Sequence, residues 1–424
     1  MIKRDFYLKQ ILRHMHNGEI KVITGIRRCG KSVLLFDLFR NYLLEKGIPK
    51  EQILIMELDQ RKYYKFRNPI TLCEYVESIV SENKDTQYYL LIDEVQFTMK
   101  VKDPENEDIE VTIYDMLNEL KAYKNLDVYV TGSNSRMLSS DIATEFRGRA
   151  TQIRVYPFSF GEFYSYVGGD ERRALEQYML YGGMPRVLQM TDEQDKKEYL
   201  SNLYSELYIK DIVERNSIER EDLLNSILDY LASSVGSLTN PTNVANAISS
   251  MRQEKVNPAL VSSYIGHTID AFLLRMAQRY DVKGKSYFHY PSKYYYTDVG
   301  LRNARLNYRQ YDPGHIMENI IFNDLIRRGY SVDVGVVVDR RNGDYVQKEI
   351  DFVVNYGDKK LYIQSALQMG TDQKESAELD SLKLTGDFFK KIIVRLDIPH
   401  SFYDDHGIFH CNLIDFLLER VELF

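Results

Sequence analysis

A glycine-rich segment near the N-terminus contains the residue types that bind phosphate. It reads Gly25-x-x-x-x-Gly30-Lys31-Ser32, after a short apolar strand and before an apolar helical run that begins at Val33. The glycines permit backbone angles that a Cβ forbids, so the N–H groups of the loop can surround an anion at the N-terminus of the following helix. Lys31 is expected to reach the β- and γ-phosphates, and the Ser32 hydroxyl to bind Mg²⁺. The pattern predicts a nucleotide-binding protein.

Three more residues belong to the candidate nucleotide-binding set, namely Arg28 and Cys29 in the loop and Val33 after it. A cysteine beside a helix N-terminus can be redox-sensitive. The alternative interpretation is that Cys29 is a packing or spacer residue.

Two carboxylates end the apolar run at residues 88–92, namely Asp93 and Glu94. A continuous apolar run is typical of a parallel strand that is covered on both faces, and ligands of open α/β sheets bind at the carboxyl ends of such strands. We expect Asp93 to help hold Mg²⁺ through its water shell and Glu94 to orient and polarise the attacking water.

The next strand of the pattern, at residues 128–135, has polar residues at its end. Asn134 or Ser133, rather than Thr131, is favoured as a sensor that hydrogen-bonds the γ-phosphate or the attacking water. The alternative is a turn rich in Ser, Gly and Asn. Farther on, the segment Arg147-Gly148-Arg149 offers an arginine to the γ-phosphate of a neighbouring subunit in a homo-oligomer, or simply a solvated charge.

Composition narrows the class of protein. The 424 residues suffice for about two to four domains, and 44% of them are hydrophobic, which supports packed cores. A net charge of −7 argues against a globally basic nucleic-acid binder, and three scattered cysteines indicate neither a disulfide framework nor a zinc site. The N-terminus lacks an apolar targeting segment, and no run is long enough to span a membrane. We therefore expect a cytoplasmic protein without a membrane partner.

The elements expected along the chain fall into four domains. Alternating strands and helices predict a doubly wound α/β domain over residues 1–165, interrupted by a charged loop or hairpin at residues 98–112. Its leading helix, residues 3–16, either lines an adenine pocket through Tyr7 or Ile11 or only packs. A helical lid is expected over residues 166–218, a winged helix-turn-helix over 219–310 and a small α+β domain over 311–424.

The expected winged helix suggests DNA as a partner. It consists of helices 222–235, 242–250 and 259–273 and a hairpin of strands 276–282 and 286–296. The third helix carries no Lys or Arg in its first turns, although base and phosphate contacts use such residues. Lys283, Lys285, Arg279 and Lys293 in the hairpin can contact a DNA backbone; the alternative is a module that binds a protein client.

Several segments accompany the loop and the carboxylate pair: Thr-Gly-Ser at 131–133, Arg-Gly-Arg at 147–149, Pro-Phe-Ser-Phe-Gly-Glu-Phe at 157–163 and Tyr-Gly-Gly-Met-Pro at 181–185. Together they resemble a prokaryotic AAA-type (AAA+) P-loop ATPase family, whose members join the P-loop domain to a winged helix and a restriction-endonuclease-like domain. The resemblance covers nearly the whole chain and is strongest before residue 216. It implies that ATP and Mg²⁺ bind at the Walker A residues Lys31 and Ser32 and at the Walker B pair, and it favours Arg149 as the finger.

The resemblance also implies a nuclease-like C-terminal domain, which we expect to be inactive. Nucleases of this fold bind metal through acidic residues and a Glu-x-Lys strand whose lysine helps to activate water. Asp351 and Glu318 match the first elements, but the corresponding strand reads Gln364-Ser-Ala366 and lacks both the carboxylate and the lysine.

The sequence thus predicts an ATPase that couples nucleotide state to conformational change in C-terminal binding modules. The alternatives are an ATP-gated DNA- or protein-binding switch with little turnover and, third, an ATP-dependent metal nuclease.

Overall fold

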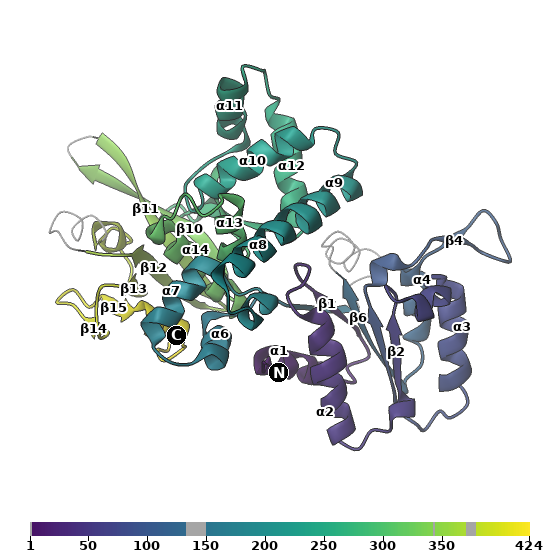
Figure 1. Ribbon diagram of the computed structural model, residues 1–424. Coiled ribbons are helices and arrows are strands. Elements are labelled where there is room, and N and C mark those ends of the chain that lie inside the picture. Colours follow the sequence, from purple (N-terminus) through teal and green to yellow (C-terminus); the bar gives the residue numbers. More distant parts are fainter. Residues whose placement is uncertain (1, 133–149, 342–343, 370–378) are drawn as a thin grey trace. The chain divides into compact units, whose positions relative to one another are not determined.

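The computed structural model describes residues 2–132, 150–341, 344–369 and 379–424 (Figure 1). The chain forms two compact units. The first contains residues 1–156 and 270–272, and the second contains residues 157–269 and 273–424.

The first unit is built on a parallel sheet. Its strands are β1 (Ile20–Thr24), β2 (Ile53–Glu57), β3 (Tyr88–Asp93), β6 (Leu126–Gly132) and β7 (Ala150–Arg154), in the order β2-β3-β6-β1-β7. All four neighbouring pairs are parallel. The predicted α/β fold with a parallel sheet is therefore confirmed for the first unit. The strand before the phosphate loop and the strand before the carboxylate pair are separated by β6.

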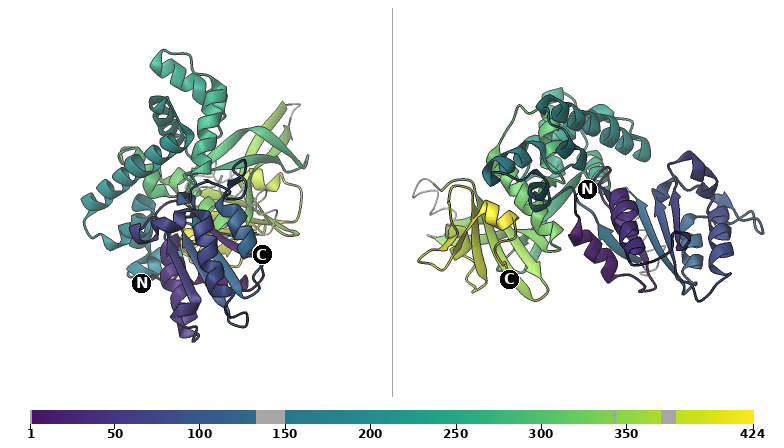
Figure 2. Two further views of the ribbon diagram at one scale, coloured as in Figure 1. Left: turned by 90° about the vertical axis from the view of Figure 1, so that its right-hand side faces the viewer. Right: turned by 60° about the horizontal axis from the view of Figure 1, so that its bottom comes forward.

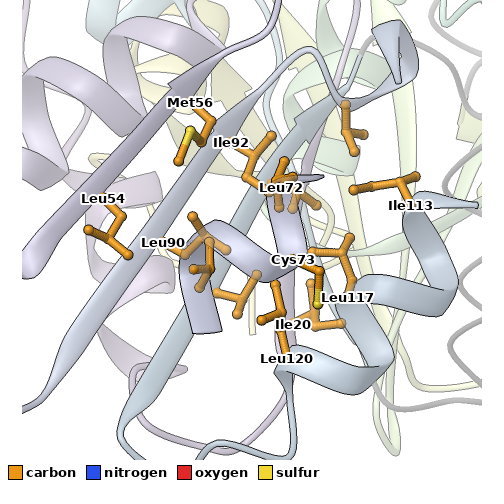
Figure 3. Close-up of a cluster of buried hydrophobic side chains, with 14 of the residues drawn as sticks. Ile20, Leu54, Met56, Leu72, Cys73, Leu90, Ile92, Ile113, Leu117 and Leu120 are labelled. Atoms are coloured by element: carbon orange, nitrogen blue, oxygen red, sulfur yellow. The ribbon is translucent and has the colours of Figure 1, made fainter. Parts of the chain in front are cut away.

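Helices cover both faces of this sheet because its strands are apolar on both sides (Figures 1 and 2). Helices α3 (Pro69–Val80) and α4 (Ile113–Leu120) pack on the face that carries Leu90 and Ile92, and Figure 3 shows the resulting core. The opposite face carries Tyr89 and Tyr129, whose rings contact Phe39. Phe39 belongs to the helix after the loop, which has a π-helical segment (Val33–Phe39) before α2 (Arg40–Glu45). The first helix, α1 (Asp5–Arg13), contacts that π-helical segment and β7.

The charged insertion forms a short hairpin, in which β4 (Val101–Lys102) pairs antiparallel with β5 (Glu110–Val111). The hairpin interpretation of residues 98–112 is therefore the correct one. Short 3-10 turns connect other elements of this unit, at Lys50–Gln52, Arg61–Arg67 and Val95–Phe97.

The second unit contains helices both before and between the strands of its sheet and one after them. They are α6 (Phe160–Val167), α7 (Glu171–Tyr181), a 3-10 turn (Pro185–Gln189), α8 (Glu193–Asn202), a π-helical segment (Leu203–Ile209), α9 (Lys210–Asn216), α10 (Glu221–Ser233), α11 (Pro241–Arg252), α12 (Pro258–Asp270), α13 (Val299–Arg305), α14 (Pro313–Arg327) and α16 (Leu413–Leu417). The sequence pattern did not predict α13. The last helix ends at Leu417.

An eight-stranded mixed sheet organises the rest of the second unit. Its strands are β8 (Leu274–Asp281), β9 (Ser286–Tyr296), β10 (Ser331–Arg341), β11 (Asp344–Tyr356), β12 (Lys359–Ala366), β13 (Lys390–Arg395), β14 (Phe402–Tyr403) and β15 (Phe409–Asn412). The order is β14-β15-β13-β12-β11-β10-β8-β9. The hairpin that was expected to be a separate wing is β8–β9, and β8 pairs with β10 at the edge of this sheet. One sheet thus continues across the boundary expected near residue 310.

The Tyr-Gly-Gly-Met-Pro segment lies where three stretches of backbone approach each other closely. A Cβ on Gly183 would lie 2.1 Å from the carbonyl oxygen of Phe158, and a Cβ on Gly300 would lie 2.0 Å from that of Tyr181. A Cβ on Gly182, whose φ is +70°, would lie 2.1 Å from a carboxylate oxygen of Asp298. Because any side chain would separate these stretches, the glycines are explained by packing within the second unit.

Asp298 holds this junction together through its carboxylate. It accepts hydrogen bonds from the backbone N–H of Gly183 at 2.7 Å and of Leu301, at the N-terminus of α13, at 3.1 Å. Burial raises its pKa to about 6, although the donated backbone hydrogen bonds oppose the shift.

We predict that Asp298 makes stability fall as the pH rises from about 4 to about 6. The folded unit binds this proton more tightly than the unfolded chain, whose Asp pKa is about 3.9, so the contribution is present below about 4 and is lost as pH rises through about 6. The lost free energy of unfolding is on the order of 3 kcal/mol. Thermal unfolding of Asp298→Asn across this range should show a shallower decline than wild type.

The test compares how steeply the stability of each protein changes with pH, not the stability at one pH. This is necessary because the Asp298→Asn substitution also weakens the N-cap of α13. Asp312→Asn makes the same change at the N-cap of α14, where the side chain is only half buried. Identical slopes for wild type and Asp298→Asn would contradict the prediction.

Candidate functional site

The predicted phosphate loop joins β1 to the helix that follows it. Gly25 and Gly30 have φ angles of +148° and +99°, which L side chains rarely adopt. The Lys31 side chain is buried, and its Nζ donates hydrogen bonds to the carbonyl oxygens of Gly25 at 3.0 Å and Ile26 at 3.1 Å. The amine therefore lies inside the loop, and it would have to exchange these bonds for phosphate oxygens when a nucleotide binds.

The other loop residues have distinct environments. Cys29 is buried and its Sγ contacts the carbonyl oxygen of Val155 at 3.5 Å, which favours the packing interpretation. Arg28 is exposed and has a left-handed φ of +62°. Val33 is 43% exposed on the helix that follows. A Cβ on Gly25 would lie 2.2 Å from the Val155 carbonyl oxygen, so the segment after β7 requires glycine there.

The carboxylate pair lies at the carboxyl end of β3, where Asp93 is the last residue of the strand and Glu94 follows it, and Thr131 lies near the end of the adjacent strand β6. The Thr131 hydroxyl donates to Asp93 Oδ1 and accepts from the backbone N–H of Glu94 at 3.0 Å. Thr131, which the sequence ranked below its neighbours, therefore connects the two acidic residues.

Asp93 is 6% exposed, and burial raises its pKa above the usual range. Hydrogen bonds from the hydroxyls of Thr131 and Ser32 and the nearby charge of Lys31 act in the opposite direction. A hydroxyl and a carboxylate at the loop are a donor set that fits Mg²⁺, which takes one or two protein ligands and completes its shell with phosphate oxygens and water. This side-chain arrangement brings Lys31, Ser32 and Asp93 to one place.

Glu94 has an unusual backbone and a close neighbour. Its φ is +53°, a left-handed conformation that is uncommon for non-glycine residues and often found at functional sites. Its half-buried carboxylate accepts a hydrogen bond from Gln96 Nε2. Gln96 was not among the functional residues predicted from the sequence, although its position two residues after Glu94 was a sign that it could contact that carboxylate.

Four predicted residues fall outside the described part of the chain. They are the sensor candidates Ser133 and Asn134 and the finger candidates Arg147 and Arg149. Their roles stay predictions.

A second group of ionisable side chains lies in the second unit, around Lys293 of β9. Its Nζ is 2.8 Å from Glu318 Oε1, 2.7 Å from Glu349 Oε1 and 3.2 Å from Asp351 Oδ1. The Lys293 side chain is only 3% exposed, so the expectation that it contacts DNA from a surface hairpin is wrong. Tyr295 also donates to Glu318 Oε1, at 2.6 Å.

The charges in this group shift one another. Burial raises the pKa of Asp351 to about 7 despite the nearby Lys293 ammonium. Burial opposes ionisation of Glu318 and Lys293 as well, but their mutual attraction together with the other charges and hydrogen bonds around them outweighs it, so the Glu318 pKa is lowered and the Lys293 pKa is raised. The backbone N–H of Asp351 donates to Gln364 Oε1 at 3.2 Å, so Gln364 serves as a structural acceptor at the position expected for a metal-binding carboxylate.

Two cavities lie away from the phosphate loop. One of about 350 Å³ lies at the opposite edge of the first unit's sheet, between His16–Ile20 and residues 121–128. Another of about 360 Å³ is lined by α6, α7 and residues 187–196.

Among the described residues, no His, Cys, Asp and Glu side chains form a group of three or more that could hold a metal ion. Within the same ranges, no helix is long and apolar enough to cross a membrane.

Comparisons with known proteins agree with the geometry of the first unit. Residues 17–164 match a family described as an AAA domain, and residues 172–312 match a domain of unknown function, DUF8612. An uncharacterized protein of Haemophilus influenzae is 33% identical over 427 residues, which cover 99% of each chain. One of Methanocaldococcus jannaschii is 26% identical over 88% of this chain and 79% of its own length. A solved Walker-type ATPase of Pyrococcus abyssi is 15% identical with a TM-score of 0.49, over 72% of this chain and 96% of that one.

Proposed function

The chain belongs to the family of the uncharacterized Haemophilus influenzae protein and contains an AAA domain at residues 17–164, and from this premise we propose that it is a Mg²⁺-dependent ATPase. Its nucleotide state would set the conformation of the second unit. The observation that carries the proposal is the meeting of Lys31, Ser32 and Asp93 at the carboxyl edge of a parallel sheet, beside Glu94.

Each side chain has a distinct task in this mechanism. The Lys31 amine leaves its two loop carbonyls and binds the β- and γ-phosphates, while the loop N–H groups bind the remaining oxygens. Ser32 and Asp93 would hold Mg²⁺, which neutralises charge that develops on the phosphates. Glu94 orients the attacking water and polarises it, and Thr131 fixes the relative position of the two carboxylates.

The proposal also includes assembly of the chain into a homo-oligomer. Asn134 would sense the γ-phosphate, and Arg149 would reach the site of a neighbouring subunit, so that hydrolysis needs a homo-oligomer. Mixing Arg149→Ala protein with Glu94→Gln protein would then restore partial activity at shared interfaces.

A second candidate is an ATP-gated switch that binds DNA or a protein client with little turnover. The observation that favours a DNA-binding version is the exposed turn between β8 and β9, which carries Lys283 and Lys285. Lys293 does not contribute to such a surface because it is buried.

We further predict that the second unit does not cleave DNA with metal. The Lys293 ammonium lies among the carboxylates of Glu318, Glu349 and Asp351, where it would compete with a divalent cation. The full chain should leave supercoiled, linear and single-stranded DNA intact with Mg²⁺ or Mn²⁺. Cleavage by wild type that disappears in Asp351→Asn would contradict this and support the nuclease hypothesis.

The proposed function is tested by steady-state ATP hydrolysis with Mg²⁺ across a range of protein concentrations, with and without duplex DNA. Specific activity that rises with protein concentration supports an assembling ATPase with a trans-acting arginine. Tight ATP binding with slow turnover at every concentration supports the switch. Absence of both binding and hydrolysis would overturn both candidates.

A further inference from the structure

The segment that leads out of the first unit is attached to the phosphate loop. Val155 and Tyr156 follow β7 and are the last residues of this unit's main stretch. The Val155 N–H donates to the carbonyl oxygen of Thr24 at 2.8 Å, directly before the loop. The Val155 carbonyl oxygen faces Gly25 and Cys29. The loop and the exit segment are therefore packed as one body.

Arg4, at the start of α1, adds a bridge between these two stretches. Arg4 is 2% exposed, and its guanidinium donates from Nη1 to the Cys29 carbonyl oxygen at 2.9 Å and from Nη2 to the Tyr156 carbonyl oxygen at 2.8 Å. The guanidinium also lies 4.4 Å from the centre of the Tyr7 ring. The Tyr7 hydroxyl accepts from the Tyr156 N–H at 3.2 Å, so α1 binds both backbone groups of Tyr156.

This bridge acts on a peptide group that faces the proposed phosphate site. In a trans peptide the carbonyl and the N–H point in opposite directions. Arg4 donates to the Cys29 carbonyl, so the N–H of Gly30 points away from Arg4, and N–H groups of such a loop are the ones that would bind phosphate. A cation that donates to the carbonyl also polarises the same peptide group and makes its N–H a stronger donor.

The chain is equally well anchored after the exit. Pro157 follows Tyr156, and proline has a fixed φ and no N–H. The next residue, Phe158, donates its N–H to the Gly183 carbonyl oxygen at 2.8 Å and accepts from the Tyr178 hydroxyl at 2.8 Å. Gly183 is in turn bound to Asp298. Tyr156 and Phe158, the residues on either side of Pro157, are thus each hydrogen-bonded within their own unit, so few backbone angles can absorb a movement of Tyr156.

We propose that Arg4 is a positioning residue of the phosphate loop and transmits nucleotide occupancy to the Tyr156–Pro157 connection. This inference rests on the proposed function, since the ligand is a nucleoside triphosphate at the loop. Binding that shifts the Cys29–Gly30 peptide changes the hydrogen bonds of Arg4, and the same guanidinium moves the Tyr156 carbonyl. Because such coupling is reciprocal, a change in the position of Val155 and Tyr156 changes the affinity for the nucleotide by the same free energy.

The test compares wild type with Arg4→Met, Arg4→Lys and Tyr7→Phe in the full chain. A fluorescent ATP analogue reports affinity, and amide hydrogen exchange with and without a non-hydrolysable ATP analogue reports residues 25–33, 155–156, 158–167 and 181–190. Arg4→Met should weaken binding by about tenfold or more, because it removes charge-assisted hydrogen bonds. At saturating analogue, Arg4→Met should keep the exchange response of the loop and lose that of residues 158–167 and 181–190.

The other variants separate positioning from general destabilisation. Arg4→Lys keeps the charge but not the planar fork, so it should recover affinity more fully than the response beyond residue 157. Tyr7→Phe removes the acceptor of the Tyr156 N–H and should raise exchange at residues 155–156 while the chain stays folded. Arg13→Met changes an exposed arginine on the same helix and should behave as wild type in every assay.

Two results would overturn the inference. One is wild-type affinity in Arg4→Met together with an unchanged response at residues 158–167 and 181–190. The other needs no nucleotide: exchange at residues 25–33 and 155–156 that is the same in Arg4→Met and wild type. The second result is informative even if the wild-type chain binds no ATP, an outcome that would overturn the proposed function instead.

Discussion

Glu94→Gln is expected to lower the ATP turnover number by about 10²–10⁴-fold while ATP still binds, because an amide cannot polarise the attacking water as a carboxylate does. The substitution preserves the size of the side chain and can keep its hydrogen bond with Gln96. The loop and the Mg²⁺ ligands proposed at Ser32 and Asp93 are unchanged. Single-turnover hydrolysis and equilibrium ATP binding, measured on the same protein, separate the two effects.

A matched control for Glu94→Gln is available on the neighbouring strand. Glu57 ends β2, beside Asp93 in the register of the sheet, and its carboxylate accepts from Gln60. Glu57→Gln should therefore leave turnover within about twofold of wild type, in the range of ordinary surface substitutions. Unchanged turnover in Glu94→Gln would remove Glu94 from its assigned role, and equal losses in both variants would point to a general effect of charge at this edge.

Lys31→Ala is expected to weaken binding of Mg²⁺–ATP by about 10–100-fold, since it removes charge-assisted hydrogen bonds to the phosphates. It also leaves the carbonyl oxygens of Gly25 and Ile26 without the donor that binds them here. Some loss of stability is therefore expected together with the loss of affinity. Calorimetric titration with ATP and with ADP gives the affinities, and thermal unfolding gives the stability.

The loss of stability must be kept apart from the loss of binding. Lys46→Ala removes an exposed lysine after the same helix and serves as the matched control. ATP affinity of Lys31→Ala equal to that of wild type, in protein that unfolds at the wild-type temperature, would contradict the phosphate-binding role of Lys31.

The first unit could be largely predicted from the sequence because its signals are local. A strand, a glycine loop and a helix follow each other without interruption at residues 20–45, and an apolar strand ends directly in Asp93. Periodicity and backbone sterics fix such elements within short windows. The parallel pairing then follows from the alternation of strands and helices.

The roles of Thr131, Gln96 and Arg4 were not predicted because they depend on hydrogen bonds rather than on pattern. Thr131 was judged against Asn134 and Ser133 by residue type alone, but its position beside Asp93 follows from the register of β3 with β6. Arg4 lies 152 residues from Tyr156 and 25 from Cys29, and no short motif connects such distant partners.

The second unit shows most clearly which features could not be predicted from the sequence. The hairpin at β8–β9 has the pattern of a wing, and only its pairing with β10 makes it an edge of the eight-stranded sheet. That pairing and the approach of α14 bring Lys293 of β9 against Glu318 and Asp351 and bury it. By itself, the sequence determined the strands and the loop of the first unit and the residues predicted to bind phosphate, since these depend on neighbours along the chain. Only the tertiary structure decided which strands share a sheet and which charges are buried together, because pairing between strands and burial depend on contacts between residues far apart in sequence.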